Sequence, residues 1–242
     1  MQAYTIVNRP FAGKHAKIED QCERFWKQPT AQADVNAYVA ETVGYVYPDI
    51  PKWLKTSTPF TNWKGPVLAE SKNALIIANH SSFSTAQYPG NPGRAGMSMI
   101  HILGIPKDNI FNGVALTGRG VSIVDEMMDL FMFSWDREPS FRREVVTAQK
   151  IAIEREYESS GDAEAYQEAM WQYHELEDYA LSLNAEYFTF GFHLWPDHSV
   201  SHLHMHIIAT PPKLRQYSTD LHDDKTVDAI DVRDYATARL SQ

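Results

Sequence analysis

Short apolar runs bounded by turn residues occur in two parts of the chain, and such runs are typical of β-strands. A turn at residues 71–73 separates the first two runs, Pro106 ends the third, and Pro211 and Pro212 end the last. Proline stops a strand because it has no backbone N–H to donate. These boundaries predict five strands, at residues 67–70, 74–78, 99–105, 187–194 and 202–209.

Elsewhere, apolar residues recur every three or four positions, which predicts amphipathic helices. Ser122 is a suitable N-cap for one helix, with Asp125 in its first turn, and Asp162 starts another after a break at Ser160-Gly161. Strands followed by helices and then by strands predict an α+β fold with an antiparallel sheet and flanking helices. The expected helices cover residues 14–26, 34–43, 122–135, 141–158, a segment from 162 onward, and 226–240.

The same pattern divides the chain into three parts. A mostly helical N-terminal extension is predicted for residues 1–65. The α+β domain is predicted for residues 66–212, and a polar C-terminal tail is predicted for residues 213–242. Residues 81–96 are rich in Ser, Pro, Gly and Asn, so they predict a long loop within the domain.

The composition of the chain disfavours several classes of function. The 242 residues include 22 Lys and Arg against 31 Asp and Glu, a net charge of −9, which disfavours binding to nucleic acid by counterion release. The chain has no apolar run near the roughly 20 residues of a membrane span, and its first residues lack a secretory signal pattern. Cys22 is the only cysteine, so no intrachain disulfide can form. A cytoplasmic or nuclear protein with a small-molecule substrate is expected.

Histidine is concentrated at one place in the sequence. Five of the ten histidines lie within the 14 residues from 193 to 206. In the expected strand 202–209, side chains at every second position share one face, so the histidines face one way and the apolar residues between them face the other. Three imidazoles on one face need hydrogen-bond partners, a bound anion or a metal. The five histidines are His193, His198, His202, His204 and His206.

Two kinds of chemistry suit this row of imidazoles. Imidazole is a common ligand for zinc, iron and copper. A neutral imidazole can also attack phosphorus as a nucleophile while its neighbours hold its tautomer and bind the non-bridging oxygens. The spacing alone does not decide between metal binding and nucleophilic catalysis.

The strand pattern His-φ-His-φ-His-φ-φ at 202–208, where φ is apolar, resembles the signature of the histidine triad superfamily of nucleotide hydrolases and transferases. Residues 197–201 precede it where that superfamily has Gly-Gln-Ser-Val-x. Residues 101–107 resemble its strand His-φ-Leu-φ-φ-Pro-Lys, and residues 67–79 resemble its opening hairpin. The segments Gly191-Phe192-His193 and 199–202 are most similar to the aprataxin-like branch. The resemblance covers about residues 67–210 and implies a histidine-triad-like sheet.

The resemblance also implies roles for individual residues. His204 would be the nucleophile that forms a covalent nucleotidyl-imidazole, and His206 would contact the phosphate or the bridging oxygen. His202 would orient His204, and His101 would support the triad from the neighbouring strand. The substrate would be a nucleotidyl phosphoramidate, an anhydride or a dinucleoside polyphosphate, with no cofactor and no metal. Two residues near the phosphate or leaving group would be Ser199 and Val200, the latter through its backbone amide.

Three positions depart from the superfamily pattern and leave the substrate open. His198 replaces a glutamine that helps to hold the phosphate, His193 stands where other branches have asparagine, and Asn79 replaces an acidic residue that contacts ribose. The same fold could therefore perform acid–base chemistry of a lyase, isomerase or cyclase type on a non-nucleotide molecule. A metal-dependent protein and a non-catalytic nucleotide sensor are further alternatives. A homodimer formed through the strand that carries His101 is compatible with the resemblance.

Overall fold

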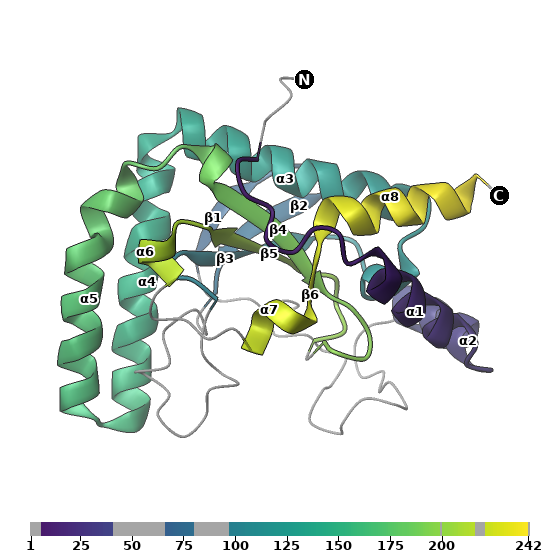
Figure 1. The fold of residues 1–242 in the computed structure, drawn as a ribbon, viewed down its shortest axis with the longest axis horizontal. Coiled ribbons are helices and arrows are strands. Elements are labelled where there is room, and N and C mark those ends of the chain that lie inside the picture. The colour runs from purple at the N-terminus through teal and green to yellow at the C-terminus, as the bar shows by residue number, and fades with distance from the viewer. Residues whose placement is uncertain (1–5, 41–65, 80–96, 199, 216–220, 242) are drawn as a thin grey trace.

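The computed structural model describes residues 6–40, 66–79, 97–198, 200–215 and 221–241 (Figure 1). Six antiparallel strands form one sheet in the order β1-β2-β3-β5-β4-β6. The expected α+β class with an antiparallel sheet is confirmed. The strands are β1 (Val67–Glu70), β2 (Ala74–Ala78), β3 (His101–Pro106), β4 (Phe188–His193), β5 (Met205–Ala209) and β6 (Thr226–Asp228).

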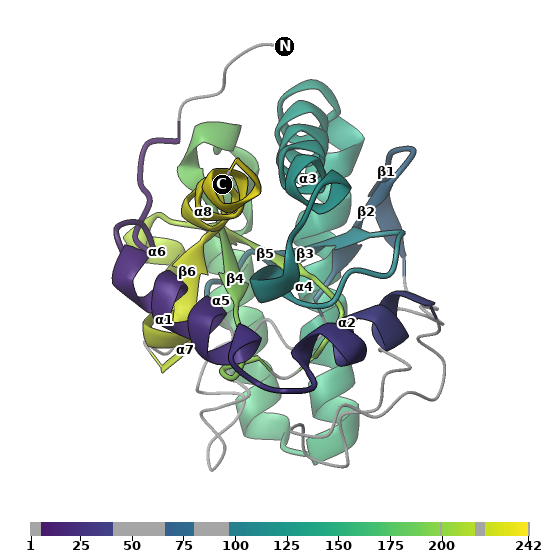
Figure 2. The same ribbon diagram turned by 90° about the vertical axis from the view of Figure 1, so that its right-hand side faces the viewer.

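Helices surround the sheet. Helices α3 and α8 lie next to each other over one face of the sheet, and α7 lies on the opposite side (Figures 1 and 2). Among the described helices none is long and apolar enough to cross a membrane. The helices are α1 (His15–Trp26), α2 (Ala31–Ala40), α3 (Arg119–Arg137), α4 (Pro139–Ser160), α5 (Ala163–Leu181), α6 (Pro212–Arg215), α7 (Leu221–Lys225) and α8 (Ala229–Leu240).

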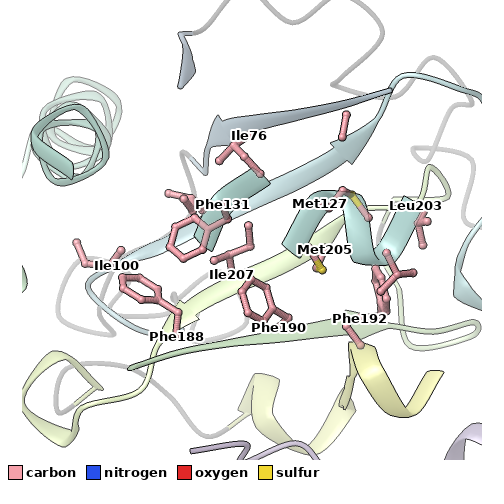
Figure 3. Close-up of a cluster of buried hydrophobic side chains, with 14 of the residues drawn as sticks. Ile76, Ile100, Met127, Phe131, Phe188, Phe190, Phe192, Leu203, Met205 and Ile207 are labelled. Atoms are coloured by element: carbon pink, nitrogen blue, oxygen red, sulfur yellow. The ribbon is translucent and has the colours of Figure 1, made fainter. Parts of the chain in front are cut away.

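The main core lies between α3 and the sheet (Figure 3). Phe131 of α3 packs edge-on against Phe188 of β4, with ring centroids 4.7 Å apart. Trp135 is fully buried, and its indole N–H donates to the carbonyl oxygen of Leu183 at 2.9 Å. Alternate residues of β4 and β5 fill this core, so the residues between them must point to the other face of the sheet.

Several predicted boundaries differ from the structure. Helix α3 begins at Arg119 and not at Ser122, because Gly118 takes a positive φ of 46° just before the helix. Asp125 therefore lies inside the helix, where it pairs with Arg233 of α8. Strand β3 begins at His101 and not at residue 99, and α2 begins at Ala31 and not at residue 34. The predicted end of α2 at residue 43 and the predicted loop 81–96 lie outside the described residues.

The C-terminal residues belong to the sheet. A helix was expected from Thr226, but residues 226–228 form β6, which pairs with β4. Helix α8 starts after Asp228, whose carboxylate accepts the backbone N–H groups of Ile230 and Asp231 at 2.9 and 3.2 Å. An aspartate N-cap of this kind starts the helix at the next residue and leaves the preceding residues extended. Arg9 also pairs with Asp228, so the N-terminal and C-terminal segments meet at this strand.

Gly191 is the point of closest approach between β4 and β6. A Cβ atom at this position would lie 2.5 Å from Thr226 Cγ2 and 3.1 Å from the carbonyl oxygen of Val227. We therefore expect Gly191→Ala to lower the free energy of unfolding by about 1–3 kcal/mol, because β6 must move. Chemical denaturation measures this loss.

Gly104→Ala of β3 is the matched control. A Cβ atom there would meet only methionine side chains, at 3.3–3.4 Å, and methionine is flexible enough to shift. Equal losses of stability in the two variants would contradict a close approach at Gly191.

Candidate functional site

Three histidines from three neighbouring strands share the sheet face opposite the main core. In the register, His206 of β5 lies across from Leu103 of β3 and Gly191 of β4. His101 is two residues from Leu103, and His193 is two residues from Gly191, so both share the face of His206. The ring centroids of His206 and His193 are 4.1 Å apart, and those of His206 and His101 are 5.1 Å apart.

The other two triad histidines precede β5. The expected strand 202–209 begins only at Met205, which corrects the prediction that all three histidines lie in one strand. His202 instead forms an isolated antiparallel bridge with Phe111, and the N–H of Leu203 donates to the carbonyl oxygen of Ile110 at 2.8 Å. The chain therefore leaves β3 at this point and pairs with residues 110–112. His204 still lies close to His206, with ring centroids 4.9 Å apart.

The tautomer of His204 follows from one hydrogen bond. Its Nδ1 lies 2.8 Å from the backbone carbonyl oxygen of His202. A carbonyl oxygen can only accept, so Nδ1 carries the proton and Nε2 carries the lone pair. Burial lowers the pKa of His204 to about 4, so the ring is neutral near pH 7. A neutral imidazole with its lone pair at Nε2 is the state that a nucleophile needs.

His202 is held by two groups from distant parts of the chain. Its Nε2–H donates to the carbonyl oxygen of Pro106 at 3.0 Å, which leaves the lone pair on Nδ1. The hydroxyl of Tyr38, from α2, donates to that Nδ1 at 3.0 Å. Tyr38 is fully buried, and burial raises the pKa of its hydroxyl, which therefore keeps its proton. The N-terminal extension thus reaches the site through Tyr38, a residue that the sequence pattern did not single out.

Tyr38→Phe tests this contact. Loss of the hydroxyl leaves the Nδ1 lone pair of His202 buried without this donor, so we expect the free energy of unfolding to fall by about 1–2 kcal/mol. The Nε2–H bond to the Pro106 carbonyl oxygen still fixes the tautomer of His202, so we expect only the Nδ1 resonance to shift in long-range ¹H–¹⁵N spectra, because Nδ1 loses its donor. Tyr187→Phe is the control, because the side chain of Tyr187 is partly exposed. An unchanged Nδ1 resonance of His202 in Tyr38→Phe would contradict the contact with the Tyr38 hydroxyl.

His101, His193 and His206, the three histidines from neighbouring strands that we call the histidine row, are also hydrogen-bonded. His101 Nε2 and His206 Nδ1 lie 2.8 Å apart, so one ring donates and the other accepts. His193 Nε2–H donates to the hydroxyl oxygen of Thr226 at 2.9 Å, because that hydroxyl donates its own proton to the carbonyl oxygen of His222. Burial, aided by the neighbouring imidazoles, lowers the pKa of His101, His193 and His206. The row is therefore neutral near pH 7.

His198 is the histidine whose hydrogen-bonding capacity is unused. Its side chain is buried against the ring of Phe111, and neither ring nitrogen has a partner within the described part of the chain. Nε2 of His206 is likewise buried without a partner there. Buried polar atoms of this kind cost about 1–3 kcal/mol each unless something binds them. His198 and His206 therefore offer hydrogen bonds to a ligand beside His204.

Of the three other predicted site residues, the structure describes Asn79 and Val200. Asn79 is half-buried and directly follows Ala78, which pairs with Ile102, so Asn79 lies at the same end of the sheet as His101. Val200 is half-buried and packs against the main core. Ser199 lies outside the described residues, and its predicted role stays a prediction.

Metal binding was the alternative use of the histidine cluster. In residues 6–40, 66–79, 97–198, 200–215 and 221–241, no three His, Cys, Asp or Glu side chains are placed to hold one metal ion. Several of the imidazole nitrogens described above are turned instead toward backbone carbonyls, hydroxyls and one another, whereas both nitrogens of His198 and Nε2 of His206 have no partner among the described residues.

Comparisons of the chain with models of protein families, with curated proteins and with solved structures gave no match.

Proposed function

We propose that this chain is a histidine-dependent enzyme that hydrolyses or transfers a nucleotidyl group, with His204 as the nucleophile. The observation that carries the proposal is the hydrogen bond from His204 Nδ1 to the carbonyl oxygen of His202 at 2.8 Å. It keeps the lone pair on Nε2 of a neutral ring, next to the polar nitrogens of His198 and His206 that have no partner among the described residues. The histidine triad motif at 202–208 supports the same assignment.

In the first step, the Nε2 lone pair of His204 attacks the phosphorus of the substrate. A phosphorus–nitrogen bond forms while the bond to the leaving group breaks, and the bonding electron pair goes with the leaving group. The substituted ring keeps its proton on Nδ1 and becomes cationic. Its hydrogen bond to the His202 carbonyl oxygen is then charge-assisted, so it is stronger in the intermediate than in the free enzyme.

In the second step, water attacks the same phosphorus. The phosphorus–nitrogen bond breaks, His204 recovers its lone pair, and the proton of the water passes to solvent. We assign His206 to an oxygen of the reacting phosphoryl group and His198 to an oxygen on the leaving-group side, where each would stabilise developing charge. We assign Asn79 to the nucleoside end of the substrate, because its amide can accept a hydroxyl proton as the acidic residue of the related motif does.

The test is turnover of two purified compounds. The wild-type protein is incubated with a diadenosine polyphosphate and, separately, with adenosine phosphoramidate, and release of adenosine monophosphate is followed by chromatography. We expect release from at least one of them, and the same rate in His174→Gln, because His174 lies exposed on α5. No release from either compound by folded protein would contradict the nucleotidyl proposal.

A further inference from the structure

Lys225 is a half-buried cation at the end of α7 that forms no ion pair with the part of the chain that the structure describes. Its ammonium makes no hydrogen bond or salt bridge with any residue in the described ranges. A lysine that loses water on burial is destabilised unless an anion compensates the charge. The charge of Lys225 therefore requires a partner that the described chain does not supply.

Asp224 is exposed to solvent, and the two other carboxylates near Lys225 are already engaged. Asp197 accepts from Lys17 at 3.0 Å and from the side-chain amide of Gln21 at 2.9 Å. Asp223, two residues before Lys225, receives two hydrogen bonds from Arg215. These pairs leave Lys225 as a net positive charge, although the whole chain carries −9. A local cation in an acidic protein favours an anionic ligand at this place.

The sheet register places Lys225 beside the histidines. The next residue, Thr226, lies directly across from His193 and bonds to its ring at 2.9 Å. Helix α7 lies on the side of the sheet away from α3, which is the side of the histidine row (Figure 1). The positive charge of Lys225 adds to burial in lowering the pKa of His193 and His204, and the charge of Asp197 raises the pKa of Lys225 against the effect of burial.

His198 completes the arrangement. It directly follows Asp197, and its ring interacts electrostatically with His204. Lys225 thus directly precedes the residue that bonds to His193, and His198 lies in the loop before the triad, against Phe111. Lys225 supplies a positive charge, and His198 supplies ring nitrogens that have no partner among the described residues.

We propose that Lys225 and His198 form an anion subsite for the phosphate that leaves from His204, so that the enzyme prefers phosphoanhydride substrates to phosphoramidates. This inference rests on the proposed function and extends it to the substrate class. The substrate would carry at least one phosphate beyond the phosphorus that His204 attacks.

The bond changes explain the preference. When Nε2 of His204 displaces a phosphate, the phosphorus–oxygen bond breaks and the leaving phosphate keeps the electron pair as an anion. No proton transfer is needed, and Lys225 binds the new charge. An amine leaving group must instead take up a proton as the phosphorus–nitrogen bond breaks. Burial lowers the pKa of His198 and His204 to about 4, so neither ring supplies that proton near pH 7. If the Lys225 ammonium supplied it, Lys225→Met would slow turnover of a phosphoramidate as well.

Binding of inorganic pyrophosphate tests the subsite without turnover. Calorimetric titration is performed on the wild-type protein, on Lys225→Met and on Lys225→Arg. We expect binding that weakens by about tenfold or more in Lys225→Met and largely recovers in Lys225→Arg. Lys213→Met is the control, because it removes the same charge from exposed α6. No binding by the folded wild-type protein, or equal affinities for wild type and Lys225→Met, would overturn the subsite.

Turnover then tests the leaving-group assignment. For Lys225→Met we expect kcat/KM for a diadenosine polyphosphate to fall by about tenfold or more, with a change of less than about twofold for adenosine phosphoramidate. Equal falls for both compounds would overturn the assignment to the leaving phosphate. A wild-type protein that turns over neither compound would defeat the proposed function, and the pyrophosphate titration would still decide whether the anion subsite exists.

Discussion

His204→Asn is expected to lower the rate of adenosine monophosphate release by about 10³-fold or more, because it removes the attacking lone pair. The change should leave the fold intact. The shorter amide of asparagine can still donate an N–H toward the carbonyl oxygen of His202, which accepts His204 Nδ1–H at 2.8 Å in the wild type. The measurement is kcat under saturating substrate, together with the midpoint of chemical denaturation.

His202→Asn tests whether His202 positions His204 without itself attacking the substrate. His202 orients His204 through its backbone carbonyl, which the substitution keeps, while its ring bonds to Tyr38 and Pro106. We therefore expect a smaller loss of kcat than in His204→Asn, about 10–100-fold. A folded His204→Asn protein that retains a tenth of the wild-type rate would rule out His204 as the nucleophile.

Acidification from pH 7 to pH 5 is expected to destabilise the protein strongly. Burial lowers the pKa of His198 and His204 to about 4 and that of His101 to about 3. In the unfolded chain these rings titrate near 6.5, so below that pH the unfolded chain binds more protons than the folded chain does. Stability is therefore fully present above about pH 6.5 and is lost as the pH falls toward 4. Each ring contributes about 2 kcal/mol of this loss at pH 5.

Chemical denaturation at a series of pH values measures the effect. His198→Gln should reduce the slope of unfolding free energy against pH, because it removes one buried titrating ring. His174→Gln should leave the slope unchanged, because the side chain of His174 is 62% exposed. A wild-type stability that stays constant between pH 7 and pH 5 would show that the imidazoles are not buried as neutral groups.

The histidine row illustrates how far strand periodicity can predict a site. Alternation at 202–208 predicted that the triad shares one face, and the structure brings His204 and His206 together, with His101 and His193 beside His206. The same alternation could not show that the chain leaves the sheet before Met205. That change depends on pairing with residues 110–112, and partners so distant in the sequence leave no local pattern.

Tyr38 and Lys225 were missed for a related reason. Tyr38 is 164 residues from His202, on a helix whose buried side looks like ordinary core packing. Lys225 lies in a segment that the sequence predicted to be a tail, and a single lysine among charged residues there does not indicate a role at the site. Both matter only because tertiary contacts place them next to the histidines. Five of the six strands and most helices were predictable, because their apolar periodicity and their turn residues are local, whereas β6 was expected to be part of a helix.

Direct detection of the covalent intermediate is the sharpest test of the mechanism. The protein is mixed with a diadenosine polyphosphate, quenched at alkaline pH, where a phosphorus–imidazole bond survives, and analysed by intact-protein and peptide mass spectrometry. We predict a mass increase of one adenylyl group, located on His204 and absent from His204→Asn. Turnover without any adduct under rapid quenching, or an adduct on another residue, would contradict the central role of His204.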